Sequence, residues 1–185
     1  MVAKLHAACA GRFFGVAADE LFGEVLSLDD VVRPSEVARA SSAIFRARSD
    51  AERIAILERF FHAIARPWRP DPTVLRAVRA IDAASGAVRV TALARGAALN
   101  QDTQEKRFRR DVGTSPKQLA CIVRIRRAVE SWRQGRSLTR ISAEAGYCDQ
   151  SHFIRQFRQV TNLTPHEFFA SAEHCPASLD ERVYS

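Results

Sequence analysis

Apolar residues recur at spacings of three and four along most of this chain, which is the pattern of amphipathic helices. A first such stretch begins at Pro34, and a second begins at Ser49 or Asp50, either of which can cap a helix. The apolar face of the second stretch is formed by Ile54, Leu57, Phe60, Phe61 and Ile64. The two stretches predict a helical hairpin over residues 34–66, whose second helix faces a core. Residues 1–33 have only a weak pattern.

Three prolines, Pro67, Pro70 and Pro72, follow the hairpin. Proline lacks a backbone donor and disfavours helix in the residue before it, so we place a domain boundary here. This gives an N-terminal helical region at 1–70, a second domain at 71–169 and a C-terminal tail at 170–185. Because the tail has Pro176 and no clear apolar period, we expect it to be only partly ordered.

Residues 71–169 are patterned as helices almost throughout. We expect helices from Thr73 to a stop at Gly86, over 90–97, over 100–112 with Gly113 as its C-terminal cap, over 116–134, and over 164–169. The first has an apolar face made of Val74, Ala77, Val78 and Ile81. The longest has an apolar face made of Leu119, Ile122, Val123, Ile125, Ala128, Val129 and Trp132. The fold class predicted is therefore all-α.

Residues 138–158 form the most informative stretch of the chain. Their pattern predicts a short helix, a turn centred on Gly146, and a second helix capped by Asp149. Phe153 and Phe157 should face the core, with Ile141 and Ala145. The opposite face of the second helix then exposes Gln150, Ser151, Ile154 and Arg155. A helix-turn-helix presents a recognition helix to the DNA major groove in this way.

The same pattern occurs twice, 49 residues apart. Phe108-Arg109 corresponds to Phe157-Arg158, Gly113 to Asn162, and Ser115-Pro116 to Thr164-Pro165, while Leu93 and Ala98 precede Ile141 and Gly146 by 48 residues. The repeat predicts two helix-turn-helix units, about 73–113 and 116–169, which share the long helix 116–134. Held rigidly, two such units can reach major-groove segments one helical turn, ~34 Å, apart.

The basic charge is concentrated in the same region. The net charge is +7 for the whole chain, +1 over residues 1–70, +8 over 71–169 and −2 over 170–185. Clustered Lys and Arg favour a polyanionic partner, because neutralised phosphates release counterions. A basic surface that merely aids solubility is the alternative.

Residues 71–169 resemble the DNA-binding domain of the AraC/XylS transcription factors. The second unit resembles it in Ile141-Ser142-x-Glu144-Ala145-Gly146-Tyr147-x-Asp149-Gln150-Ser151-His152-Phe153-x-Arg155-x-Phe157-Arg158 and Leu163-Thr164-Pro165. The first does so in Arg107-Phe108-Arg109, Val112-Gly113-Thr114-Ser115-Pro116-Lys117 and Arg124. It departs at Ala98, where the family prefers glycine, at Gln104, which replaces a leucine, and at Lys106, which replaces an arginine.

This resemblance implies a bacterial, cytoplasmic transcription regulator that binds double-stranded operator or promoter DNA. It also implies RNA polymerase and a second copy of the chain as candidate partners. Residues 10–66 loosely resemble the end of the sensory region in one group of these regulators. Because no strand-rich segment is found here, we expect the sensory region to be truncated, and no effector is indicated.

The candidate contacts to DNA follow from which side chains the two helix faces expose. Glutamine pairs with adenine, arginine with guanine, and isoleucine can meet a thymine methyl group. The candidates are Gln101, Asp102, Glu105, Lys106, Arg109, Lys117, Gln150, Ser151, Ile154, Arg155 and Arg158. The pool for phosphate contacts is Arg109, Arg110, Lys117, Arg124, Arg126, Arg127, Arg140 and Arg158. Acidic residues weaken the first unit as a DNA binder, and its exposed face is alternatively a solvated one.

Other functions have weaker support. Cys148 and His152 are four residues apart, but two ligands do not make a metal site, so we expect His152 to contact phosphate or to pack. An enzyme would need an activated thiol, for which Cys148 is the candidate, and we predict neither enzymatic activity nor a cofactor. No signal peptide or membrane span is evident. A helical interaction module, with the 34–66 hairpin mediating dimerisation and DNA binding secondary, is the main alternative.

Overall fold

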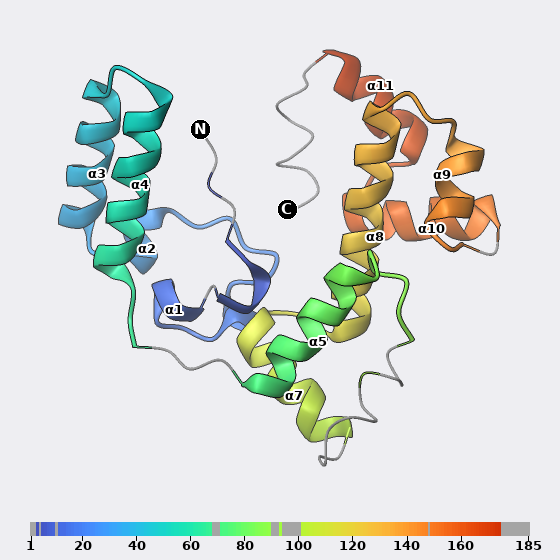
Figure 1. The fold of residues 1–185 in the computed structure, drawn as a ribbon, viewed down its shortest axis with the longest axis horizontal. Coiled ribbons are helices and arrows are strands. Elements are labelled where there is room, and N and C mark those ends of the chain that lie inside the picture. Colours follow the sequence, from blue (N-terminus) through green and yellow to red (C-terminus); the bar gives the residue numbers. More distant parts are fainter. Residues whose placement is uncertain are drawn as a thin grey trace.

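The computed structural model describes residues 3, 5–9, 11–67, 71–89, 93, 101–147 and 149–174. Within these residues the regular structure is helical and contains no strand, which confirms the predicted all-α class. Figure 1 shows a helical hairpin at one end of the molecule, a group of three helices at the other, and one long helix that leads into that group.

The first 33 residues form only short helical turns, as their weak pattern indicates. These are η1 (Ala7–Cys9), α1 (Gly11–Phe14), η2 (Ala18–Glu20) and α2 (Leu28–Val31). The last of them begins in a capping box: Ser27 accepts a hydrogen bond from the Asp29 amide, and Asp30 accepts one from the Ser27 amide.

The predicted hairpin is present as α3 (Pro34–Arg46) and α4 (Asp50–Ile64). Ser49 caps α4, since its hydroxyl accepts a hydrogen bond from the Glu52 amide at 3.2 Å. The predicted core face of α4 is partly wrong, because Ile54 is 52% exposed while Ile56 is buried. Since α3 packs along one side of α4, the buried positions follow Ile56 and Phe60, four residues apart.

The first helical unit consists of α5 (Pro72–Ala83), α7 (Gln101–Val112) and the start of α8 (Pro116–Arg133). The four apolar residues predicted for α5 are all buried, together with Phe108 of α7 and Leu119, Ala120 and Val123 of α8. Gly86 follows α5 with φ of +80°, a conformation that favours glycine. The helix expected over 90–97 lies outside the described residues, apart from Leu93, which packs against this cluster.

The second unit consists of α9 (Leu138–Glu144), α10 (Gln150–Thr161) and α11 (Pro165–His174), packed on the second half of α8. Gly113 and Asn162 follow α7 and α10 in the left-handed conformation, with φ of +92° and +58°, as the repeat predicts. α11 extends beyond the predicted end at Phe169, because Ala170, Ala172 and Glu173 favour helix.

The N-terminal turns pack directly against the first unit. Ala8 of η1 is completely buried in the same cluster as Val74, Val78 and Phe108, and η2 contacts α7. The division of the chain at residue 70 therefore stays a prediction, because residues on both sides of it share one core.

Candidate nucleic-acid interface

The turn between α9 and α10 places α10 at a fixed angle to the rest of the second unit. Gly146 has φ of +73°, and the Tyr147 amide donates to the Ser142 carbonyl at 3.1 Å. Asp149 then begins α10, because its carboxylate Oδ1 accepts from the His152 amide at 2.7 Å. The predicted cap is confirmed, and it fixes the first residue of the helix.

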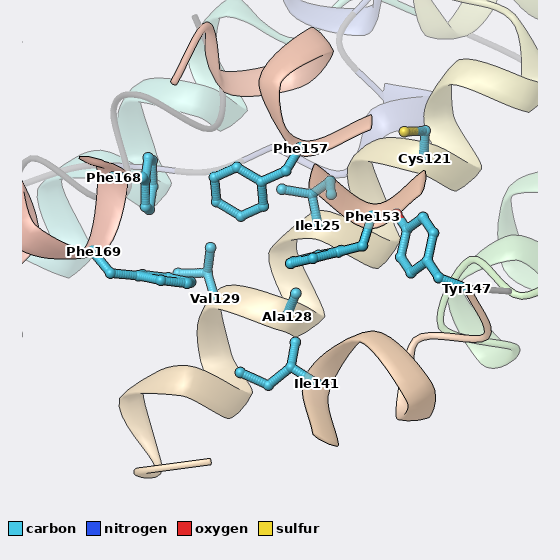
Figure 2. Packing of buried hydrophobic residues seen from close by; sticks show 10 residues of the cluster. All are labelled: Cys121, Ile125, Ala128, Val129, Ile141, Tyr147, Phe153, Phe157, Phe168 and Phe169. Atoms are coloured by element: carbon cyan, nitrogen blue, oxygen red, sulfur yellow. The ribbon is translucent and has the colours of Figure 1, made fainter. Parts of the chain in front are cut away.

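The inner face of α10 is held by an aromatic cluster (Figure 2). Phe153 and Phe157 are completely buried, and their ring centroids lie 5.6 Å apart. Ile141 is buried beside them, and Ala145 packs against the cluster, as predicted. Trp132 stacks on Phe169 with 4.3 Å between ring centroids, so this tryptophan serves packing.

The outer face of α10 carries polar and basic side chains in solvent. Gln150, Ser151, Arg155 and Arg158 are all exposed, as predicted. Ile154 differs from its prediction, since it is half-buried and packs against the aromatic cluster. An aliphatic side chain at the border between two helix faces stabilises the fold when it covers apolar neighbours.

The corresponding face of α7 is partly neutralised by its own side chains. Asp102, Lys106 and Arg109 are exposed, and Glu105 is half-buried. Arg109 donates to Glu105 Oε1 at 2.9 Å, so this arginine is already paired. The side chain of Gln101 lies outside the described part of the chain. Of the predicted cations on this face, Lys106 makes no ion pair with another described residue.

Two polar contacts hold α7 in place. Arg107 donates to Asp71 Oδ2 at 3.0 Å, and the other oxygen of Asp71 accepts from the Thr73 amide at 2.8 Å. Burial tends to raise the pKa of Asp71, but the hydrogen bonds from Thr73 and Arg107 outweigh it and lower the pKa overall. Gln104, the replacement for leucine, is buried, and its amide donates to the Leu93 carbonyl at 3.5 Å.

The predicted pool of phosphate-binding cations divides by pairing. Five of its arginines have carboxylate partners: Arg109 with Glu105, Arg110 with Asp111, Arg126 with Asp82, Arg127 with Glu130, and Arg140 with Glu144. Hydrogen bonds from Arg140 and Arg136 lower the pKa of Glu144. Lys117, in the first turn of α8, and Arg158 are exposed and form no ion pair with other described residues.

Arg124 of the same pool points inward. Its Nη2 donates to Gln156 Oε1 at 3.2 Å, and its guanidinium carbon lies 4.9 Å from the centroid of the Tyr147 ring. Sequence analysis did not single out Gln156. The one signal in the sequence that could have identified it is its position between the core residues Phe153 and Phe157.

Groups for other chemistry are sparse in the part of the chain that the structure describes. No cluster of three or more potential metal ligands occurs there. His152 packs edge-on against Tyr147 with 5.3 Å between ring centroids, and Cys148 lies outside the described residues. Burial raises the pKa of Cys121, which disfavours its thiolate. Among the described helices none is long and apolar enough to cross a bilayer.

Comparison with known proteins adds one match. Residues 93–171 match the family described as Helix-turn-helix domain, a range that begins at Leu93, includes α7, α8, α9 and α10, and ends within α11. Neither the curated proteins nor the solved structures contain a match to the chain. Over residues 93–171 the chain therefore matches a helix-turn-helix domain of the AraC type, a domain that implies sequence-specific DNA binding in transcription regulation.

Proposed function

We propose that the chain reads an operator or promoter with two recognition helices, α7 and α10, placed in successive major-groove segments of one DNA face. The two helices belong to units joined by the 18 residues of α8, a rod of about 27 Å at 1.5 Å per residue. The separation needed is one helical turn of DNA, ~34 Å. A single chain could then read a long site without a partner.

The observation that carries this proposal is the arrangement of α10. Its inner face is fixed by buried phenylalanines, while its outer face presents Gln150, Ser151 and Arg155 without covering structure among the described residues. Gln150 suits an adenine and Arg155 a guanine, and Ser151 can bond to either kind of base edge. Ile154 is half-buried, so we assign it a smaller role. Lys117 and Arg158 are the phosphate contacts.

The first unit contributes mainly to binding of the DNA backbone and less to recognition of the bases. Lys106 is its available cation, whereas the charge of Arg109 is balanced by Glu105. Asp102 and Glu105 can accept from cytosine but repel phosphate. We therefore expect α10 to provide most of the sequence discrimination and α7 to provide register. Gln101 stays a proposed contact on sequence grounds.

Binding measurements on the full chain test these roles. A duplex selected from a random-sequence library is compared with a scrambled duplex of the same composition. Arg155→Ala should cost ~1–3 kcal/mol on the selected duplex and relax its sequence preference. Lys117→Ala should weaken both duplexes alike and reduce the salt dependence by about one charge.

Arg59→Ala is the matched control, because it removes one exposed positive charge from α4, outside the helix-turn-helix domain. Equal affinity of the wild-type chain for selected and scrambled duplexes would exclude specific reading by either unit.

A second role, self-association through the N-terminal region, has its own support. The large apolar side chains that are exposed in the described structure lie between residues 16 and 54, among them Phe45 at 91%, Val25 at 87% and Ile54 at 52% exposure. Where such side chains form one contiguous patch, the patch is typical of an interaction site. We propose a second copy as its partner. Sedimentation of the full chain should detect a dimer that Phe45→Glu weakens, and a monomer at all concentrations would contradict this role.

We also propose the divisions 1–70, 71–169 and 170–185 as functional regions and RNA polymerase as a further partner. A cytoplasmic location follows from the regulatory role. Pull-down of purified polymerase by the DNA-bound chain tests that contact.

A further inference from the structure

Arg124 lies in the middle of α8, where the two helix-turn-helix units meet. Toward the second unit, its Nη2 donates to Gln156 Oε1 of α10 at 3.2 Å. Its guanidinium also lies over the ring of Tyr147, the residue that follows the Gly146 turn, with 4.9 Å to the ring centroid. One side chain therefore contacts both the recognition helix and the turn that leads into it.

Toward the first unit, the same residue supports the turn that closes α5. A Cβ atom added to Gly86 would lie 2.7 Å from Arg124 Cγ and 2.3 Å from the Ala120 carbonyl oxygen, so the backbone of this turn lies directly on α8 at Arg124. Arg124 also lines a cleft of about 360 Å³, with Ala84 and Ala87 of that turn and Ile141 of α9. Because the units leave this cleft between them, apolar packing alone does not fill the junction.

The contacts that Arg124 makes at this junction restrain the direction in which its side chain points. The Nε atom of Arg124 is buried and has no hydrogen-bond partner in the described structure, although the residue as a whole is half-buried. A guanidinium that lies over an aromatic ring and also donates a hydrogen bond is restrained at two points. Gln156 Oε1 also accepts from the Cys121 thiol at 3.4 Å, so a second residue of α8 orients the acceptor.

Tyr147 stays a neutral phenol over the whole range in which the protein would work. Burial raises its pKa to about 12, although the nearby Arg124 charge opposes the shift. The contact between Arg124 and this ring is therefore a cation–π contact rather than an ion pair, and pH does not switch it.

We propose that Arg124 is the positioning residue that fixes the angle of α10 relative to α7, and so the distance between the two DNA half-sites that one chain can read. It touches no base in this arrangement. The inference rests on the proposed reading of DNA by both helices. The part that concerns the angle between α10 and α7 can be tested without DNA.

The first experiment measures the angle in the free full chain. Spin labels are placed at the exposed positions Thr103 of α7 and Gln159 of α10 through an unnatural amino acid, so that Cys121 keeps its contact. The wild-type chain should give one narrow distance distribution by double electron–electron resonance. Arg124→Gln and Gln156→Leu should each broaden or shift it, and the double variant should add little, because both remove the same contact.

Arg127→Gln is the control for this measurement, since Arg127 pairs with Glu130 on its own helix. Arg124→Lys keeps the charge but loses the planar group, and it should fail to restore the narrow distribution. An unchanged distribution in Arg124→Gln, with the chain still folded by circular dichroism, would overturn the inference whatever DNA the chain binds.

The second experiment measures spacing tolerance on the selected duplex, with one or two base pairs inserted between its half-sites. Misplacing a half-site should cost the wild-type chain about 5- to 100-fold in affinity, as a mismatched base pair does. Arg124→Gln should flatten this dependence or move its optimum. A broadened distribution with unchanged spacing dependence would contradict the link to half-site distance, and failure of the wild-type chain to select a two-part site would count against the proposed function instead.

Discussion

At the scale of single residues, the same amino acid has opposite roles at different positions. Phe153 is completely buried in the cluster that holds α10, whereas Phe45, at the end of α3, is 91% exposed. Arg155 points into solvent, while Arg107 and Arg124 hold elements together. Residue type alone therefore does not assign a role, and the environment does.

Removing the two phenylalanine side chains should have very different costs. Phe153→Ala leaves a cavity in a closed core and should lower the free energy of unfolding by about 3–5 kcal/mol. Phe45→Ala, the control, should change it by less than about 0.5 kcal/mol at protein concentrations where the chain is monomeric. Urea unfolding of the full chain, followed by circular dichroism, measures both, and similar costs for the two variants would refute the burial assigned to α10.

The Asp71–Arg107 pair should make stability depend on pH. The pKa of Asp71 is lowered from its ordinary value of 3.8, so its contribution is fully present above that value and is lost as the pH falls through the folded-state pKa. Asp71→Asn can still cap α5 but loses the charged pair. The wild-type chain should exceed this variant in unfolding free energy near pH 7, and the difference should shrink below about pH 4. If the difference in unfolding free energy between the wild type and Asp71→Asn did not change with pH, the charged Asp71–Arg107 pair would not stabilise the fold.

Sequence reasoning predicted those residue roles that depend on local pattern. The period of α10 gave Phe153 and Phe157 as core residues, and the position of Asp149 gave the cap. The prediction that Arg124 contacts phosphate was wrong. Its hydrogen-bond partner, Gln156, lies 32 residues away in the sequence, so the local pattern gives no sign that Arg124 points inward. Contacts across the chain are set by packing, which the local pattern does not contain.

At the scale of helices, side-chain capping determines where α8, α10 and α11 begin. Asp149 caps α10 through the His152 amide, and Ser115 caps α8, with Pro116 in its first turn. The Thr164 hydroxyl accepts from the Glu167 amide at 3.3 Å, and Glu167 accepts from the Thr164 amide at 2.8 Å, a capping box at the start of α11. The hydrogen bonds that the Thr164 amide and hydroxyl donate to the Glu167 carboxylate lower the pKa of Glu167.

Loss of the α10 cap should affect stability and DNA binding together. Asp149→Ala leaves backbone donors without a partner and should lower the unfolding free energy by about 0.5–2 kcal/mol. Asp149→Asn should restore most of it, because asparagine caps as well. Ser49→Ala, which removes the cap of α4, should destabilise without changing the affinity of the folded chain for the selected duplex. Thermal melts and binding isotherms of the wild type and the three variants measure these effects. If Asp149→Asn were as unstable as Asp149→Ala, capping would not be the role of Asp149.

Element types were more predictable than element limits. Every described helix of eight or more residues was expected, since each has a periodic apolar face or a clear start signal. The apolar period predicts an end of α11 at Phe169, five residues too early, because the alanines that follow favour helix. The apolar period predicts the buried face of α4 only in part, because Ile56 rather than Ile54 is buried in the structure.

At the scale of the whole molecule, the N-terminal turns and the first helix-turn-helix unit share a core. Ala8 is completely buried with Val74 and Phe108, and the Ala18 carbonyl oxygen lies 2.7 Å from the position that a Cβ atom would take at Gly113. A change at the N-terminal end should therefore reach α7, more than 90 residues away in sequence.

Ala8→Glu tests this connection. An unpaired charge forced into the shared core should lower the unfolding free energy by more than about 2 kcal/mol and weaken DNA binding. Ala51→Glu makes the same substitution at an exposed position of α4 and should leave both nearly unchanged. If the two variants had the same unfolding free energy and the same affinity for DNA, the N-terminal turns would not share a core with the first unit.

The central claim is that one chain places two recognition helices on one face of DNA, and a base-resolution footprint of the full chain on its selected duplex tests it most directly. Two protected major-groove segments about one helical turn apart are expected. Arg155→Ala should remove protection in the segment bound by α10 and leave the other in place. A single protected segment, or two that Arg155→Ala weakens equally, would contradict it.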